Sequence, residues 1–152
     1  MTDTRQTLTQ ELKEARQMML DLLKTLESHT AIYPEWTTKE LLAHITGWDE
    51  AVIVALKTHF AGEMPAIVAP RGIDHYNAET VSTRETLSYD HIYREWVATR
   101  GQLLGLISEA KEENFVGDMT YPWGQTGPVT GIIQVLIHHE KSHVAEISEA
   151  LK

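Results

Sequence analysis

Apolar residues recur along most of the chain at spacings of three and four, which is the period of an amphipathic helix. The first such segment, residues 5–28, predicts a helix whose buried face carries Leu8, Leu12, Ala15, Met19, Leu22, Leu23 and Leu26. A second helix is expected after Pro34, with Thr37 or Thr38 as its N-terminal cap. Its wide apolar face carries Leu41, Leu42, His44, Ile45, Trp48, Ala51, Val52, Ala55 and Leu56. One histidine, His44, therefore lies among apolar neighbours.

Two more helices are predicted in the second half of the chain. The third covers residues 84–108, and its buried positions are Leu87, Ile92, Trp96, Val97, Leu103, Leu104 and Ile107. An aromatic and glycine-rich loop at 121–127 precedes the last helix, which Pro128 opens and which runs to about Leu151. Strand-like alternation is absent over any useful length. The pattern predicts an all-α four-helix bundle.

A connector of about twenty residues, 61–80, separates the second and third helices. It contains prolines and glycines without a sustained period, and a short helix is expected at 73–79. Connectors this long between neighbouring helices often contain functional residues, or cross from one side of a bundle to the other. His75 and Tyr76 are therefore candidates for the mouth of a pocket. The chain, residues 1–152, is predicted to be a single domain because its length fits one.

Charge and composition narrow the expected partners. The chain has 13 Lys and Arg against 22 Asp and Glu, a net charge of −9. The basic surface expected for nucleic acid or an anionic membrane is missing, so neither is expected as a partner. No apolar run approaches a membrane span, and the first residues lack the features of a signal peptide, so a cytoplasmic location is predicted. Because the chain has no cysteine, any metal ligands must be nitrogen or oxygen atoms.

A pair of histidines four residues apart, His139 and His143, lies on the last predicted helix. Residues at i and i+4 share one face of a helix, so both imidazoles can reach one divalent metal ion. His44 supplies a third imidazole, and its burial without a partner would be costly. Placing these three rings around one cation removes that cost, so all three are predicted metal ligands. The neighbouring His138 cannot share their face and is expected behind the ligands or on the surface.

Residues 36–49, read as WTTKELLAHITGWD, together with the later H-x-x-x-H, resemble the DinB/YfiT-like metalloenzyme superfamily over nearly the whole chain. In that family a Trp-x-x-Lys-x-Leu-Leu-x-His-Ile opening of the second helix supplies one ligand, and H-x-x-x-H on the last helix supplies two. These positions correspond to His44, His139 and His143. The resemblance implies a bundle that binds nickel, zinc, iron or manganese, with water in the remaining positions, and that is frequently a homodimer.

The activities of the family are diverse. Relatives with assigned activities conjugate or isomerise small molecules with bacillithiol, mycothiol or glutathione, and a related self-resistance branch opens strained rings without the metal. The resemblance therefore implies a metal-dependent thiol S-transferase or isomerase that acts on small electrophiles with a low-molecular-weight thiol as cosubstrate. Non-catalytic binding or sequestration of a small molecule and metal-independent self-resistance are the alternatives. The sequence identifies no catalytic base.

Several residues near the histidine pair need separate interpretation. The pair also matches H-E-x-x-H, a zinc-protease motif, but no extended third-ligand pattern follows, so a protease is not favoured.

On an ideal helix Glu140 points about 100° away from His139, so we interpret it as solvent-facing, with a role as base for metal-bound water left open. Glu146, three residues past His143, is better placed as a partner of a ligand or as a fourth ligand. Trp48 is either a core residue or a pocket wall.

Overall fold

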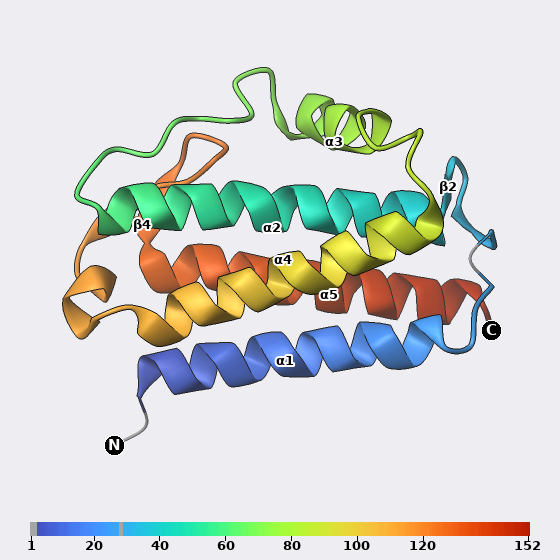
Figure 1. The fold of residues 1–152 in the computed structure, drawn as a ribbon, viewed down its shortest axis with the longest axis horizontal. Coiled ribbons are helices and arrows are strands. Elements are labelled where there is room, and N and C mark those ends of the chain that lie inside the picture. The colour runs from blue at the N-terminus through green and yellow to red at the C-terminus, as the bar shows by residue number, and fades with distance from the viewer. Residues whose placement is uncertain (1–2, 28) are drawn as a thin grey trace.

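The computed structural model describes residues 3–27 and 29–152, and four long helices contain most of them (Figure 1). In chain order the elements are α1 (Thr4–Leu23), β1 (Ala31–Tyr33), β2 (Trp36–Thr37), α2 (Thr38–Phe60), α3 (Ile73–Ser82), α4 (Tyr89–Glu109), η1 (Glu112–Phe115), β3 (Asp118–Thr120), β4 (Thr126–Pro128) and α5 (Val129–Ala150). Helices α1, α2, α4 and α5 run along the long axis of the molecule. The predicted all-α four-helix bundle is confirmed.

Helix α2 packs against α4, and α1 packs against α5, while the shorter α3 lies across the outer side of α2 (Figure 1). Helix α2 begins after Thr37, one of the two predicted caps. The Glu40 carboxylate accepts hydrogen bonds from the backbone N–H and the hydroxyl of Thr37, at 2.9 and 2.7 Å. This contact satisfies backbone donors that the start of a helix leaves without partners.

The ends of some helices differ from the sequence prediction. Helix α1 ends at Leu23, before the predicted end at residue 28, which lies outside the described residues. Helix α4 begins at Tyr89 and not at residue 84, because the Ser88 hydroxyl accepts a backbone N–H of the first turn and so caps the helix there. The short helix expected in the connector is present as α3 and extends three residues further than predicted, to Ser82.

Two antiparallel hairpins, β1–β2 and β3–β4, were not predicted from the sequence. Each strand has only two or three residues, which is too short for an alternating pattern to be visible. The first hairpin connects α1 to α2 and pairs Tyr33 with Trp36. It lies at the end of the bundle where α2 begins and α5 ends (Figure 1).

The core consists of two apolar clusters, one toward each end of the bundle. One contains Leu12, Leu56, Leu103 and Ile133, and the other contains Met19, Leu42, Trp96 and Ile147. Between the two clusters along the helices lie four buried charged side chains, one from each long helix: Arg16, Asp49, Arg100 and Glu140. We call these four residues the charged layer.

In the charged layer, each arginine bridges both carboxylates. Arg16 donates to Glu140 at 2.6 Å and to Asp49 at 3.3 Å. Arg100 donates to both oxygens of Asp49 at 3.1 Å and to Glu140 at 2.8 Å. The guanidinium of Arg16 also lies 3.8 Å from the centre of the Trp96 ring. Burying charges is costly unless they are paired, and this layer pairs two positive with two negative groups.

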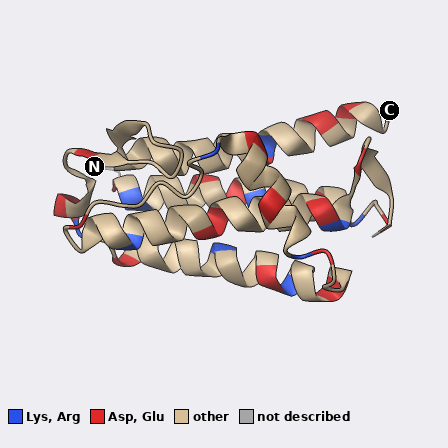
Figure 2. Ribbon diagram, turned by 90° about the horizontal axis from the view of Figure 1, so that it is seen from above, with Lys and Arg blue, Asp and Glu red and all other residues tan. Residues whose placement is uncertain are grey.

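Among the described residues, none of the helices has both the length and the apolar character needed to cross a membrane. Acidic and basic residues are spread along the helices, and in the view of Figure 2 basic residues do not dominate any one side.

Candidate metal centre

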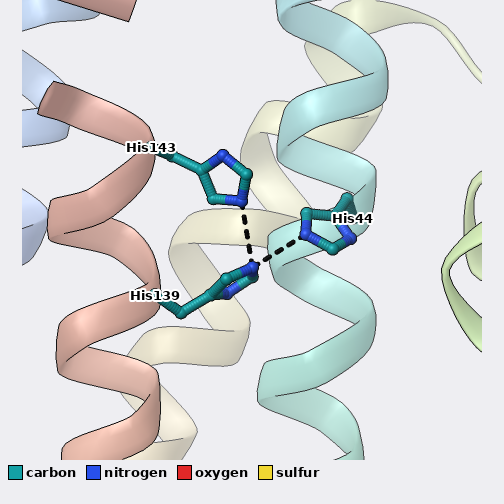
Figure 3. Close-up of side chains that lie close together, drawn as sticks. All are labelled: His44, His139 and His143. Atoms are coloured by element: carbon teal, nitrogen blue, oxygen red, sulfur yellow. Dashed lines mark hydrogen bonds between the residues drawn. The ribbon is translucent and has the colours of Figure 1, made fainter. Parts of the chain in front are cut away.

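Three histidines from two helices meet at one place in the bundle (Figure 3). One of them, His139, directly precedes Glu140 of the charged layer in the sequence. His44 comes from α2, whereas His139 and His143 lie one turn apart on α5. The Nε2 atom of His139 lies 2.8 Å from Nε2 of His44 and 3.0 Å from Nε2 of His143. One ligand atom from each ring can be chosen so that all lie within 4.8 Å of one another. The structure thus brings together the three residues predicted as ligands.

The contacts within this trio fit a cation better than they fit hydrogen bonds. A ring nitrogen of neutral imidazole offers either one hydrogen or one lone pair. Nε2 of His139 faces two other Nε2 atoms, so it cannot form an independent hydrogen bond with each. Metal–nitrogen bonds of about 2.0–2.1 Å place neighbouring ligand nitrogens roughly 3 Å apart, close to the separations seen here. The residues therefore suit a divalent ion with nitrogen ligands.

Burial keeps the three rings neutral. Burial lowers the pKa of His44 from 6.5 to about 3, with smaller contributions from the positive charge that His139 and His143 would carry. Burial likewise lowers the pKa of His139 to about 4, and it also lowers the pKa of His143. Nδ1 of His44 is buried without a hydrogen-bond partner among the described residues. Neutral imidazole is the form that ligates metals, so the site is in the correct protonation state at neutral pH.

The β1–β2 hairpin covers the histidines with two aromatic rings. The Tyr33 hydroxyl lies 2.6 Å from Nδ1 of His143 and donates to Glu146 at 3.4 Å. Burial and the nearby Glu146 carboxylate raise the pKa of Tyr33, so its hydroxyl stays protonated. The Trp36 ring packs 5.0 Å from the His44 ring. Sequence reasoning did not identify Tyr33, because nothing in the pattern showed the hairpin that carries it.

The histidines line a cavity of about 410 Å³. Its other lining residues are mainly apolar or aromatic, with a few polar groups: Trp48, Ile73, Asn77, Trp123, Val135, Leu136, Ser142 and Glu146. These lining residues include no lysine or arginine. A larger groove of about 500 Å³ lies between the start of α2 and α3, but it contains no comparable group of ligands. We therefore place the candidate site in the smaller cavity.

Residues 11–147 match the sequence model of the DinB superfamily. The chain belongs to the DinB superfamily. No protein of curated function matches this DinB-superfamily chain in sequence.

Solved structures share the fold at low sequence identity. A mycothiol-dependent maleylpyruvate isomerase superposes with a TM-score of 0.80 and 14% identity over 97% of this chain, but over only 63% of the isomerase. DfsB, described as a sibling lethal factor precursor, gives a TM-score of 0.79 and 17% identity over 98% of this chain and 95% of its own. The colibactin self-resistance protein ClbS gives a TM-score of 0.78 and 15% identity over 97% and 95%. At these identities the likeness shows the fold alone.

The expectation that nucleic acid is excluded as a partner was wrong. ClbS, which has this fold, was crystallised in complex with double-stranded DNA. The expectation rested on the net charge of −9, which is a sum over the whole molecule. Such a sum does not describe the local surface at which a nucleic acid would bind. The acidic balance of this DinB-superfamily chain therefore does not exclude nucleic acid as a partner.

Helix α3 forms one wall of the cavity. Ile73 and Asn77 line it, whereas the predicted mouth residues His75 and Tyr76 do not. The Tyr76 hydroxyl instead donates to the backbone carbonyl of Gly47 at 2.8 Å. A Cβ atom on Gly47 would lie 2.0 Å from the Thr80 hydroxyl, so the close approach of α3 to α2 requires glycine there.

The interpretation of Glu140 as solvent-facing was wrong. Its side chain is fully buried in the charged layer, where its two oxygens accept hydrogen bonds from Arg16 and Arg100. Glu140 lies on the same face as Leu136 and Val144, which are also buried, so this face of α5 points to the bundle core. With both oxygens held by arginines, Glu140 is not available as a base for metal-bound water.

The remaining predicted site residues lie at the edges of the cavity. Trp48 is buried in the core and also lines the cavity, so both of its interpretations apply. Its indole N–H donates to the side-chain oxygen of Asn77 at 2.6 Å, a contact that sequence reasoning missed. Glu146 is exposed and reaches Tyr33, and His138 is exposed on the neighbouring face of α5.

Proposed function

We propose that this chain binds one divalent metal ion through His44, His139 and His143, and that it conjugates or isomerises small electrophiles with a low-molecular-weight thiol. The observation that carries the proposal is the convergence of three neutral imidazoles on one side of a largely apolar cavity. Membership of the DinB superfamily supports it, as does the fold shared with a mycothiol-dependent isomerase.

A bound divalent ion would lower the pKa of a thiol and so supply a thiolate at neutral pH. Because the chain has no cysteine, the sulfur must come from a cosubstrate. In conjugation, the sulfur forms a bond to an electrophilic carbon, the leaving group departs with its bonding electron pair, and the thiol proton passes to solvent. In isomerisation, the thiol adds to the substrate and is eliminated again, so it is regenerated.

The cavity walls favour a flat, uncharged electrophile. The rings of Trp48 and Trp123 lie 5.8 Å apart in an edge-to-face arrangement and offer apolar surface. Because the Asn77 oxygen accepts from Trp48, its amide NH₂ is left to donate to a substrate oxygen. No lysine or arginine lines the cavity to pair with an anionic substrate.

The first test is elemental analysis of protein purified without a histidine tag. We expect one metal ion per chain in the wild type and loss of that metal in His44→Ala, His139→Ala and His143→Ala. His138→Ala, an exposed neighbour on the same helix, is the matched control and should retain the metal. Full occupancy in His139→Ala, or an empty wild type after incubation with nickel, zinc, manganese and anaerobic ferrous iron, would contradict the metal site.

The second step is an assay of the metal-loaded protein with bacillithiol, mycothiol and glutathione. Chlorodinitrobenzene, a flat and uncharged electrophile, is a suitable probe because thiol addition releases chloride and changes its absorbance. We expect turnover with at least one thiol and none in His139→Ala.

Self-resistance or sequestration without metal is the second candidate function. It is favoured by the fold shared with ClbS over 95% of that protein, a more complete overlap than with the isomerase. In this case a small molecule would bind without thiol-dependent turnover, and the three alanine variants would bind it as well as the wild type does. Equilibrium dialysis of the same variants separates the two functions.

A further inference from the structure

We propose that Tyr33 is a positioning residue that, together with Glu146, orients His143 for metal binding. The inference rests on the proposed metal site, because it concerns the ring that would present its Nε2 atom to the ion. The Tyr33 hydroxyl contacts Nδ1 of His143 at 2.6 Å, whereas Nε2 of the same ring faces His139. The two nitrogens of one ring are thus held by different partners.

The β1–β2 hairpin holds Tyr33 in place. Tyr33 pairs with Trp36, and their rings meet edge to face at 6.1 Å. The Tyr33 ring also meets His143 at 5.7 Å, while the Trp36 ring packs on His44 at 5.0 Å. One hairpin therefore contacts a histidine of α2 and a histidine of α5, the two helices that supply the proposed ligands.

The hydrogen-bond donors and acceptors of Tyr33, Glu146 and His143 connect the direction in which the Tyr33 hydroxyl donates to the tautomer of His143. The Tyr33 hydroxyl has one hydrogen, and the Glu146 carboxylate can only accept. When Tyr33 donates to Glu146, it must accept from Nδ1–H of His143, which leaves the Nε2 lone pair free for an ion. When Tyr33 donates to Nδ1, the hydrogen of the neutral ring lies on Nε2 and blocks it as a ligand.

Glu146 favours the first arrangement. Its oxygen lies 3.4 Å from the hydroxyl, which is long for an O–H···O hydrogen bond, so a small movement would strengthen the contact. The carboxylate is on the same helix as His143, one turn further along, so both move with α5. Partners that fix the tautomer and orientation of a ligating histidine typically contribute about 10- to 100-fold to metal affinity.

The test is the zinc affinity of Tyr33→Phe, measured by competition with a chelator of known affinity. We expect zinc to bind about 10- to 100-fold more weakly, while the thermal midpoint of the metal-free protein changes little. In the zinc-loaded wild type, nitrogen NMR of the imidazoles should show the hydrogen of His143 on Nδ1, protected from exchange, and this protection should be lost in Tyr33→Phe. A merely structural role would not change that signal.

Tyr89→Phe is the matched control. Tyr89 is a half-buried tyrosine of α4 whose hydroxyl forms no hydrogen bond with the described residues, so the zinc affinity of Tyr89→Phe should equal that of the wild type. Glu146→Gln keeps an acceptor oxygen but loses the charge, so it should weaken zinc binding less than Tyr33→Phe does.

The outcomes separate this inference from the proposed function. Unchanged zinc affinity in Tyr33→Phe, with binding abolished in His139→Ala, would overturn the role of Tyr33 and leave the metal site intact. Weaker zinc binding in Glu146→Gln but not in Tyr33→Phe would mean that Glu146 contacts the ion directly, which also overturns the inference. A wild type that takes up none of zinc, nickel, manganese and ferrous iron would overturn the proposed function and this inference together.

Discussion

The buried histidines make the stability of the metal-free protein depend on pH. In the unfolded chain each ring has an ordinary pKa near 6.5, whereas burial lowers the pKa of His44 to about 3 and that of His139 to about 4. At pH values below 6.5 and above about 4, the histidines of the unfolded chain bind protons that the same histidines of the folded protein do not. The free energy of unfolding should therefore be unaffected by these rings above pH 6.5 and decrease as the pH falls toward 4.

This dependence is measured by urea unfolding of the chelator-treated protein between about pH 7 and pH 5, where each site contributes at most about 1.4 kcal/mol per pH unit. His44→Gln, which is neutral throughout, should flatten the dependence, and the exposed His138→Gln should leave it unchanged. If the free energy of unfolding changed equally with pH in the wild type and in His44→Gln, His44 would not be held neutral in the folded protein.

At the scale of residues, the sequence predicted which three histidines meet in the structure, but not which residues surround them. The spacing of His139 and His143, and the apolar neighbours of His44, are local patterns that can be read directly. The partners of these rings come from distant segments, such as Tyr33, 110 positions before His143. A single sequence contains no signal for such a contact.

At the scale of elements, the packing of α3 on α2 depends on Gly47. In Gly47→Ala the new methyl group would overlap the Thr80 side chain, so α3 must move away from α2. Overpacking of this kind costs about 1–3 kcal/mol in the free energy of unfolding. Thr80→Ala in the same protein should recover part of the loss, because it removes two of the overlapping atoms, Oγ1 and Cγ2, and leaves the Thr80 Cβ.

The matched control is Gly101→Ala, at an exposed position within α4 where no atom lies within 4 Å of the added methyl group. Alanine is the better helix former, so this change should stabilise the protein by roughly 0.5–1 kcal/mol. Urea unfolding measures both variants. A Gly47→Ala protein as stable as the wild type would contradict the close packing of α3.

Apart from the short helix at 73–79, the elements that the sequence predicted are those long enough to show a period. The four long helices were found because each repeats its apolar spacing over several turns. The hairpins were missed because strands of two or three residues cannot show alternation. The predicted start of α4 is too early, because the prediction counts Leu87 among the buried positions of this helix, whereas the cap at Ser88 marks the boundary.

At the scale of the whole molecule, the charged layer joins all four long helices. Arg100→Met would leave Asp49 and Glu140 with a single arginine in a buried setting. Removing one partner from a buried ion pair typically costs about 3–5 kcal/mol in the free energy of unfolding. Arg100→Lys keeps the charge but not the forked geometry, and its loss should be intermediate.

Arg94→Met is the control on the same helix. Arg94 pairs with Asp90 on the surface, where both side chains are largely exposed, so the change should stay within about 0.5 kcal/mol. Urea unfolding of both variants tests the difference. Similar stabilities for Arg100→Met and Arg94→Met would mean that the charged layer contributes little to holding the helices together.

The sequence does contain a pattern that indicates the charged layer. Each member lies at core spacing within its own helix, as in Leu12–Arg16–Met19 and Leu136–Glu140–Val144. Two positive and two negative residues at such positions, on four helices, balance one another. Together they indicate a buried network, whereas Glu140 considered alone is expected at the surface.

The position of Glu140 beside His139 also fixes the register of the last helix. If α5 slipped by one turn, about 5.4 Å, either Val144 or Leu136 would face the arginines, and Glu140 would enter an apolar cluster. The same slip would leave only one of the two α5 histidines beside His44. A bundle with this slip would therefore have unbalanced buried charge and an incomplete site at the same time, so the contacts of the charged layer also favour the register that brings the three histidines together.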